Sequence, residues 1–454
     1  MKPTRRRLSL VALLAAVAIG ITAPAFAYVV LTVAANPAGT TQTGALSAVS
    51  NVTVTPNSAN STSVSWTNPG SQLSGVNYVV KNTTNNTTVC TVASTASSCG
   101  ATNDTSVFAG QTYSYSVAAT LVADTNWTAT ATGSGTTPDV FAVTPTTAET
   151  AGTQFTMTVQ AQKATSPTNS TLVTDTAYAG AQSVKFSGAA ASPNGTLPSF
   201  NGASGSSSDP SVTTSLTFAS GVVTLPVTLY NAVTSGTVTA TAGALTGTAT
   251  FTVNAAPAAT MTATAGTNQF VSMGAAYATK FAVQLKDTYG NAVSGATVTF
   301  TAPTSGASGT FAASGCSSQP PTSRCAVTTT STGTATATTF TANSTAGGYS
   351  VTASAGSLST TFQVANTSAN LTLNPTSGHA SATVTLTGTS WTHSSTLTAT
   401  FNGSAVTLTN GTTDTNGHIV GSCTFAVPSI ANGTYLVVVT DAGGKVGAAT
   451  FTVN

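Results

Sequence analysis

The chain has 454 residues, of which 41% are hydrophobic and only 4% are charged. Its formal net charge is +2, but four of the eleven basic residues (Lys2, Arg5, Arg6 and Arg7) lie at the N-terminus, leaving seven basic against nine acidic side chains in the remainder. That remainder has a net charge of −2 and no basic patch, which excludes an electrostatic surface for nucleic acid or for an anionic membrane.

Apolar residues alternate with Thr and Ser over much of the chain, as in residues 52–55 and 248–253. A period of two predicts β-strands with one buried face, so we expect an all-β fold. The length allows three or four domains. Because hydroxyl and amide groups replace ions on the surface, stability is expected to depend only weakly on salt.

The N-terminus is identified as a secretory signal peptide over residues 1–27. It has a basic start, an apolar stretch over residues 8–23 and the small-residue site Ala25-Phe26-Ala27. We expect cleavage after Ala27 and export to the cell surface or the medium, by the general secretory route in preference to the weakly matched twin-arginine route. The apolar run continues to Ala35, which is long enough to span a hydrocarbon core of ~30 Å. An uncleaved anchor is therefore the alternative, and only then would the chain contact a membrane.

A linker is expected over residues 28–45, and the first domain over residues 46–138. Strand patterns in this domain include residues 63–66 and 113–117, and they carry Trp66 and Tyr113. The pattern resembles a fibronectin type III module, which implies a β-sandwich with Trp66 in its core and the Tyr113 hydroxyl fixing a corner before a strand. The rings could instead form a ligand platform, but inward strand positions favour core packing.

The second domain is expected over residues 139–255. Residues 155–161 and 222–229 have strand patterns, and residues 236–253 suggest a closing hairpin. The stretch 187–210 is rich in Ser, Gly, Asn and Pro, which predicts a long loop or a partly disordered segment. This domain resembles other bacterial immunoglobulin-like surface domains only in general style.

The third domain, over residues 256–366, contains the most specific motif of the chain. Asp287 can cap a turn with its carboxylate, and Gly290 and Asn291 tolerate positive φ. Val298 and Phe300 then point to one face of a strand. The motif consists of Asp287, Gly290, Asn291, Val293 and Gly295. It resembles the Asp-x-x-Gly-Asn-x-Val-x-Gly motif of invasin/intimin-type bacterial immunoglobulin-like repeats, which implies another sandwich of ~100 residues.

The fourth domain is expected over residues 367–454. Turns joined to alternating strands recur at residues 373–378, 384–388, 401–403, 414–417 and 432–435. This pattern resembles an IPT/TIG-like immunoglobulin module. The chain as a whole is thus predicted to be a tandem series of immunoglobulin-like β-sandwiches behind a signal peptide.

Four of the five cysteines form two pairs with the same spacing, Cys90 with Cys99 and Cys316 with Cys325. In an exported protein such pairs between strands predict disulfides. A zinc site is the alternative, but no histidine lies near either pair in the sequence. Cys423 remains, and its alternating surroundings predict a buried free thiol, with a reactive or intermolecular thiol as the alternative.

No catalytic or cofactor-binding motif is present, so we expect neither an enzyme nor a cofactor. The carboxylates are isolated on turns, whereas a glycosidase needs two of them within ~5 to 9.5 Å. Asp287 and Asp414 each precede a glycine by three positions, which is turn chemistry, with calcium coordination as an alternative. His379, His393 and His418 lie in turns that need not converge, so exposed loop residues are expected in preference to a metal site.

The sequence therefore predicts a secreted or cell-surface structural and adhesion protein. Its domains would bind an unidentified surface protein or glycan through loops or edge strands, or associate with one another at sheet edges. The alternative is a carbohydrate-binding or accessory protein of an extracellular polysaccharide-degrading system. That function normally needs a row of exposed aromatic side chains, and the chain has three Trp residues.

Overall fold

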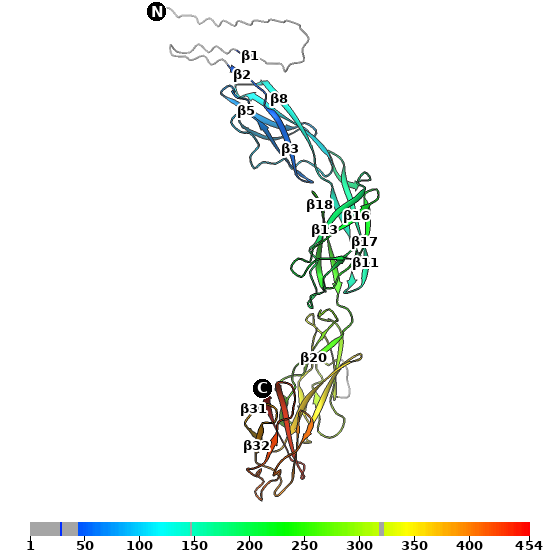
Figure 1. Ribbon diagram of the computed structural model, residues 1–454, viewed down its shortest axis with the longest axis vertical. Helices are drawn as coiled ribbons and strands as arrows, with labels where there is room; N and C mark the ends of the chain where they lie inside the picture. The colour runs from blue at the N-terminus through cyan, green and yellow to red at the C-terminus, as the bar shows by residue number, and fades with distance from the viewer. Residues whose placement is uncertain (1–27, 30–43, 146–147, 317–321) are drawn as a thin grey trace, which may run out of the picture. The chain divides into compact units, whose positions relative to one another are not determined.

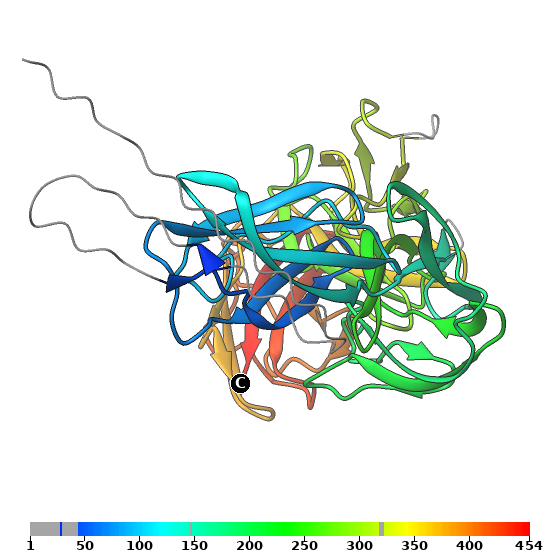
Figure 2. The ribbon, with the colours of Figure 1, turned by 90° about the horizontal axis from the view of Figure 1, so that it is seen from above.

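The computed structural model describes residues 28–29, 44–145, 148–316 and 322–454. Regular structure in these ranges consists of β-strands without helices (Figure 1, Figure 2), which confirms the predicted all-β fold. None of the described residues belongs to a helix that could cross a membrane. The predicted signal peptide lies outside the described residues.

The chain divides into two compact units, which we describe separately. Unit 1 comprises residues 1–140, 161–177 and 243–245, and unit 2 comprises residues 141–160, 178–242 and 246–454. Strand β11 (Gln154–Ser166) contributes its first half to unit 2 and its second half to unit 1. The boundaries of the four predicted domains divide the chain more finely than these two units, and they stay predictions.

Unit 1 contains the first sandwich. The strands of unit 1 are β1 (Tyr28–Val29), β2 (Gly44–Ala45), β3 (Ser50–Ser58), β4 (Ser61–Thr67), β5 (Val76–Asn82), β6 (Thr87–Ala93), β7 (Thr112–Leu121), β8 (Asp124–Thr136) and β12 (Asn169–Thr174). The β3-β4 sheet packs on the four-stranded sheet β6-β5-β7-β8. Strand β12 pairs antiparallel with the second half of β11.

The core of the first sandwich follows from alternation in its strands. In β5 every second side chain is buried, and Tyr78 is fully buried beside Trp66, with ring centroids 5.7 Å apart in an edge-to-face arrangement. Trp66 is 5% exposed, and its indole N–H donates to the Ala96 carbonyl oxygen. Trp66 is therefore a core residue here and presents no aromatic platform.

Unit 2 begins with the second sandwich. Its strands are β9 (Val140–Thr144), β10 (Glu149–Thr150), β13 (Gly180–Ser187), β14 (Ser199–Phe200), β15 (Ala203–Ser204), β16 (Val212–Phe218), β17 (Val222–Thr228), β18 (Val233–Ala242) and β19 (Leu245–Asn254), with the first half of β11. One sheet has the order β10-β19-β18-β13-β16, and in the other β11 pairs with β17, which pairs with β14 and then β15. Phe186 and Phe200, one from each sheet, stack with ring centroids 4.7 Å apart.

The stretch 187–210 contains more structure than the loop or disordered segment that its composition predicts. It includes β14 and β15, and Phe200 is only 1% exposed. Burial of the Phe200 ring between the two sheets, together with the pairing of β14 with β17, brings this Ser- and Gly-rich segment into the fold.

The third sandwich contains the Asp287 motif. Its strands are β20 (Thr260–Ala265), β21 (Gln269–Ser272), β22 (Ala282–Lys286), β23 (Thr297–Thr301), β24 (Gly309–Phe311), β25 (Arg324–Thr328), β26 (Thr334–Thr336), β27 (Phe340–Ala342), β28 (Gly347–Ala355) and β29 (Leu358–Thr367). They form sheets of order β20-β22-β26, β21-β29-β28-β23-β25 and β24-β27. Val298 and Phe300 on β23 are both fully buried, as their alternation predicts.

The fourth sandwich completes unit 2. Its strands are β30 (Thr372–Asn374), β31 (Ser377–Gly378), β32 (Thr383–Thr387), β33 (Leu397–Phe401), β34 (Ser404–Val406), β35 (Thr424–Ala426), β36 (Gly433–Asp441) and β37 (Val446–Val453). The sheets have the orders β30-β32-β35 and β31-β37-β36-β33-β34. Buried clusters within residues 46–119, 277–364 and 369–453 give the first, third and fourth sandwiches a core each.

Candidate functional site: the domain junctions

The Asp287 turn lies where the second sandwich meets the third, within unit 2. One carboxylate oxygen of Asp287 accepts hydrogen bonds from the backbone N–H groups of Tyr289 (2.8 Å) and Asn291 (2.9 Å). The other accepts from the Asn291 side-chain amide (2.8 Å) and from the backbone N–H of Ala256 (2.9 Å). Asp287 is 3% exposed, so four donors compensate a buried carboxylate. The turn and the linker from the second sandwich thus share one anchor.

Asn291 connects this turn to the second sandwich directly. Its amide nitrogen donates to the Tyr230 carbonyl oxygen (2.7 Å), and its side-chain oxygen accepts from the Ala232 backbone N–H (2.9 Å). Asn291 is itself 3% exposed. Both bonds reach the loop between β17 and β18, so the turn that begins the motif also clamps the preceding sandwich. We call Asp287 and Asn291, with these partners, the polar junction.

Side chains around the polar junction add a second contact. The rings of Tyr230 and Tyr289 meet at a centroid distance of 4.9 Å, and Asn194 donates to the carbonyl oxygens of Thr288 and Tyr289. Gly152 has a φ of +78°, and a Cβ there would overlap the Tyr289 ring. Glycine at this position therefore lets the tyrosine lie against the second sandwich.

The two motif glycines have local roles. Gly290 has a φ of +82° and completes the turn, because its N–H donates to the Asp287 carbonyl oxygen. Gly295 has a φ of +75°, and its N–H donates to the Thr329 carbonyl oxygen. Neither glycine contributes a side chain to the junction.

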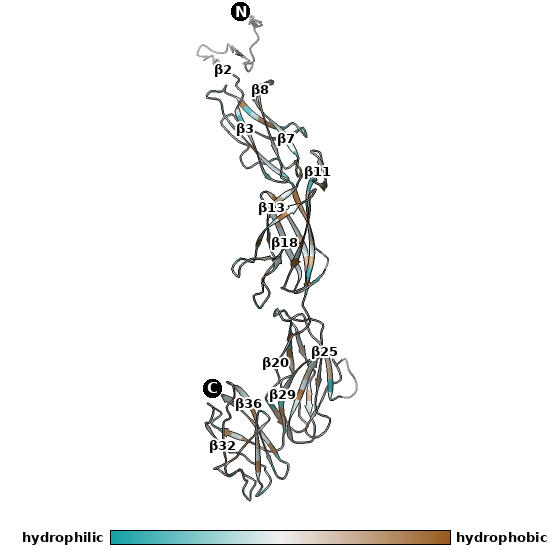
Figure 3. Cartoon of the chain, turned by 45° about the vertical axis from the view of Figure 1, so that its right-hand side comes forward, coloured by the Kyte–Doolittle hydropathy of each residue, from teal (hydrophilic) through white to brown (hydrophobic). Residues whose placement is uncertain are grey.

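The contact between the third and fourth sandwiches is of a different kind. Strand β36 lies beside β29 (Figure 3). Side chains on both faces of β36 are buried. Val437 and Val439 belong to the core of the fourth sandwich, whereas Leu436 and Val438 belong to a separate cluster. That cluster consists of Ala365, Leu436, Val438, Val446 and Ala448, with Ala346 packed against it. We call it the apolar junction.

The short linker between these two sandwiches is fixed as well. The backbone N–H groups of Ser368 and Ala369 both donate to the Val446 carbonyl oxygen, at 2.8 and 2.9 Å. The Val446 N–H donates in turn to the Ser368 hydroxyl oxygen. The third and fourth sandwiches are thus joined both by linker hydrogen bonds and by an apolar cluster.

Unit 1 contains a third contact, around Tyr113. The Tyr113 hydroxyl accepts from the Phe108 backbone N–H (2.7 Å), which is the bond of a tyrosine corner, and lies 3.0 Å from the Pro167 carbonyl oxygen, to which it donates. The Gln111 amide donates to the Ala164 carbonyl oxygen (2.6 Å). One tyrosine thus fixes its own loop and holds the segment that follows β11.

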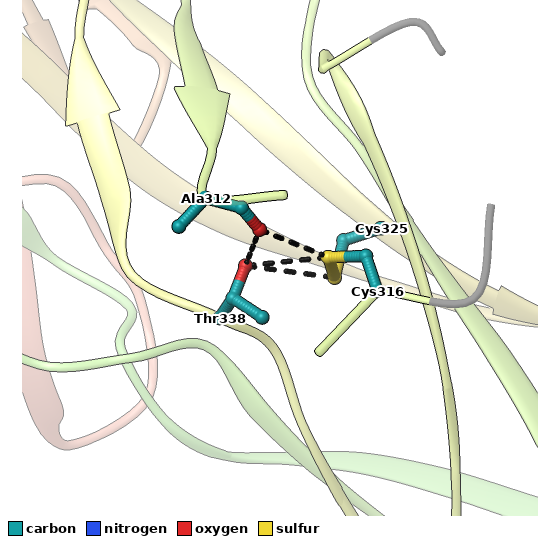
Figure 4. The surroundings of a disulfide bond; sticks show 4 residues. All are labelled: Ala312, Cys316, Cys325 and Thr338. Carbon is teal, nitrogen blue, oxygen red and sulfur yellow. Dashed lines mark hydrogen bonds between the residues drawn. A yellow bond between two sulfur atoms is a disulfide. The ribbon is translucent and has the colours of Figure 1, made fainter. Parts of the chain in front are cut away.

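Both predicted cysteine pairs are disulfide-bonded. Cys90 and Cys99 have Cα atoms 5.8 Å apart, and Cys316 and Cys325 have Cα atoms 4.9 Å apart. Figure 4 shows the second bond beside Thr338, whose hydroxyl donates to the Ala312 carbonyl oxygen and lies 3.3 Å from the Cys316 sulfur. Each disulfide closes a short loop between strands.

Cys423 is free and fully buried, and burial raises the pKa of its thiol. His379, His393 and His418 are exposed. His418 lies 3.6 Å from the Asp414 carboxylate, and its backbone hydrogen bond is the largest cause that lowers the pKa of Asp414, with smaller contributions from the charges of His418 and His393. No group of three metal-ligating side chains is found in the described ranges.

Two carboxylates of the fourth sandwich accept hydrogen bonds from the backbone of turns. Asp441 accepts from the N–H groups of Thr392 and Lys445, and Asp414 accepts from those of Asn416 and His418. Despite burial, four donors around Asp104, including the Tyr115 hydroxyl, hold the pKa of its carboxyl below the ordinary value. A hollow of about 710 Å³ beside the polar junction has no charged side chain in its lining. These arrangements supply turn stability, and none pairs an acid with a base across a cleft.

The sequence analysis did not predict which residues make the contacts between neighbouring sandwiches. The motif predicts a turn at Asp287, but nothing in its spacing indicates that Asn291 bonds to residues 230–232. The apolar junction did leave a signal, because Leu436, Val437, Val438 and Val439 form a continuous apolar run. Such a run predicts a strand buried on both faces.

Comparisons with known proteins give similar structures only. No protein-family model matches the chain, and no curated protein matches it. A tetra-tandem repeat in the extending region of a large adhesion protein is 16% identical over 90% of this chain and 98% of that one, with a TM-score of 0.24. Invasin, a bacterial integrin-binding protein, is 16% identical over 70% and 60%, with a TM-score of 0.24. Domains 1–6 of the surface layer protein SbsC are 17% identical over 90% and 66%, with a TM-score of 0.21.

These neighbours are of the class that the motif resemblance predicts, namely tandem surface and adhesion proteins. At such TM-scores the likeness carries no argument about what this chain binds. We take the sandwich fold from the strand order and register described above.

Proposed function

We propose that this chain is a secreted or cell-surface structural and adhesion protein whose immunoglobulin-like sandwiches act as a spacer and bind partners non-covalently. The observation that carries this proposal is the construction of the junctions. Two buried polar side chains in one junction and an apolar cluster in the other are used to hold neighbouring sandwiches together. A chain of domains that served only as flexible beads would not need Asp287 and Asn291 buried between them.

The test of the spacer role is a distance measurement across the polar junction in the full chain. Spin labels at Ser183→Cys on β13 and Ser359→Cys on β29 occupy exposed positions of the second and third sandwiches. We expect a narrow distance distribution that broadens in Asn291→Ala. A label pair within the third sandwich, at Thr297→Cys and Ser359→Cys, is the control and should be narrow in both proteins. A broad distribution across the junction of the unsubstituted chain would contradict the spacer role.

Export is part of the proposal and is supported by the two disulfides, which form and persist in oxidising compartments. Fractionation of the native host, with N-terminal sequencing of the recovered protein, tests it. A mature N-terminus at Tyr28 in the medium or the envelope is expected. Recovery in the cytosol would overturn it, and recovery in membranes with Met1 intact would establish the anchored alternative.

The proposed partner is a surface protein or glycan, or a second copy that pairs at a sheet edge. Strand β12 is an edge strand without charged residues, and its Leu172 and Val173 are 43% and 42% exposed. Pairing at such an edge uses unsatisfied backbone groups. Analytical ultracentrifugation of the full chain and of Val173→Lys compares self-association directly, and equal behaviour of the two would exclude this edge.

A carbohydrate-binding role receives less support. Trp66 and Trp391 are 5% and 3% exposed, so of the three Trp residues Trp127 alone has a substantially accessible ring. Planar sugar sites use exposed aromatic faces. Saturable binding on a glycan array that Trp127→Ala abolishes would restore the alternative. We likewise propose that the chain is not an enzyme, since the turn carboxylates Asp287, Asp414 and Asp441 accept hydrogen bonds from backbone N–H groups.

A further inference from the structure

Three titratable side chains meet at the contact around Tyr113 in unit 1. Lys163 lies on β11, Asp175 follows β12, and Asp139 follows Pro138 at the end of the first sandwich. The Lys163 amine lies 2.8 Å from a carboxylate oxygen of Asp175. The carboxyl groups of Asp139 and Asp175 share a hydrogen bond, which requires one proton between them.

This cluster is part of an interface, because loop 108–111 of the first sandwich packs against it. Gly110 has a φ of +64°, and a Cβ there would overlap both the Asp139 carboxyl and the Lys163 side chain. The Gly110 N–H donates to the Pro138 carbonyl oxygen (3.1 Å), and the Ala164 N–H donates to the Ala109 carbonyl oxygen (2.9 Å). The loop thus lies directly on the Asp139 carboxyl and the Lys163 side chain.

The charges around the pair are few. Loop 108–111 contributes no titratable group, β11 contributes Lys163, and the segment after β12 contributes Asp175. Burial, followed by the hydrogen bond and the charge of Asp175, raises the pKa of Asp139 to about 6, and Lys163 opposes this rise. The hydrogen bond from Lys163 is the largest cause that lowers the pKa of Asp175. One carboxyl of the pair is therefore protonated in mildly acidic solution while the other stays ionised.

We propose that the Asp139–Asp175 pair is a proton-operated latch, in which one shared proton holds loop 108–111 against the β11–β12 segment and its loss loosens that contact. When Asp139 ionises, two carboxylates face each other and Lys163 neutralises only one of them. The repulsion between the two carboxylates then acts next to Gly110, where loop 108–111 packs on Asp139. The latch regulates how firmly this contact is held, whichever partner the protein binds.

The direction of the pH dependence follows from the two carboxyls. Because the pKa of Asp139 is raised above its ordinary value of 3.8, its contribution is fully present below 3.8 and is lost as pH rises through about 6. Because the pKa of Asp175 is lowered, its contribution is present above 3.8 and is lost as pH falls. Both contributions are fully present only near pH 3.8, so the contact is firmest there and loosens as pH rises through about 6.

Hydrogen exchange in the full chain, corrected for the intrinsic pH dependence of amide exchange, tests the latch. Protection of the Gly110 and Ala164 amides is expected to fall about tenfold between pH 5 and pH 8, a value well below the full linkage effect because the group is partly solvated. In Asp139→Asn the side-chain amide replaces the protonated carboxyl as donor to Asp175. Protection in this variant is expected to stay constant over the same range.

Asp209→Asn, an exposed carboxyl in unit 2, is the matched control and should retain the pH dependence of the unsubstituted chain. A second variant, Lys163→Gln, removes the cation that favours ionisation of Asp139, so the fall in protection should move to higher pH. The latch is overturned if the unsubstituted chain shows no fall, if Asp139→Asn falls as the unsubstituted chain does, or if Lys163→Gln leaves the midpoint in place.

Discussion

In the polar junction, Asp287 and Asn291 join the second and third sandwiches through hydrogen bonds to three backbone groups outside the turn, at Ala256, Ala232 and Tyr230. The apolar junction instead packs Leu436 and Val438 of β36 against the third sandwich. Hydrogen bonds are directional, so the polar junction specifies one arrangement with two side chains. Its weakness is that removal of either partner leaves buried donors without acceptors.

The apolar junction depends on hydrophobic packing, which has no preferred direction. Its stability rises with the apolar area removed from water, so losses are graded with the size of the side chain removed. Its linker bonds, from Ser368 and Ala369 to Val446, then supply the register that packing alone does not fix. Two sandwiches are thus joined in one place by a few directional hydrogen bonds and in the other by buried apolar surface area.

The largest effect is expected for Asp287→Ala. This change removes the acceptor of four hydrogen bonds and leaves the half-buried N–H groups of Ala256 and Tyr289 and the buried N–H of Asn291 unsatisfied. We expect a loss of about 3–5 kcal/mol in the free energy of unfolding of the third sandwich. Urea unfolding followed by hydrogen exchange measures it. Asp209→Ala, an exposed turn carboxylate, is the control, and equal losses in both variants would contradict the junction role.

Leu436→Ala should break the apolar junction more gently. Leu436 is 2% exposed, and a truncation of this kind in a packed cluster costs about 2–3 kcal/mol. Exchange at the Ser368 and Ala369 amides should increase while protection in β32 stays unchanged. Leu172→Ala removes the same atoms from an exposed strand and should cost almost nothing. An unchanged linker in Leu436→Ala would show that the hydrogen bonds alone hold this contact.

Asn291→Ala is expected to remove the hydrogen bonds to the second sandwich while the Asp287 turn itself stays folded. The bonds to Tyr230 and Ala232 are lost, but Asp287 still accepts from Tyr289 and Asn291 backbone N–H groups. We expect a cost of about 1–2 kcal/mol, with faster exchange at Ala232. Asn60→Ala in an exposed turn is the control. Intact protection at Ala232 would mean that the Tyr230–Tyr289 contact suffices.

Salt should have the smallest effect. Asp287 is satisfied by neutral donors, and no ion pair contributes to either junction of unit 2 among the described residues. Raising NaCl from 0.05 to 1 M should therefore change protection at Ala232 and Ala369 to the same small extent, by less than about 0.5 kcal/mol. Selective loss at Ala232 would indicate that the buried carboxylate depends on an unscreened charge.

Much of the fold could be predicted from the sequence because it depends on local pattern. Period-two alternation placed β4, β7, β11 and β23, and pairs of cysteines across short loops predicted both disulfides. Composition misjudged residues 187–210, because burial of the Phe200 ring and the strand pairing of β14 depend on distant partners that composition does not show.

What the sequence determined by itself is therefore the sandwich type, the turn at Asp287 and the role of Trp66 as an inward ring. Tertiary structure alone decided what each turn holds: Asn291 reaches residues about sixty positions away, at Tyr230 and Ala232, and Tyr113 reaches Pro167. The reason is physical. Alternation and turn chemistry act between neighbours in the chain, whereas a junction is set by which backbone donors and acceptors meet when two folded surfaces come together.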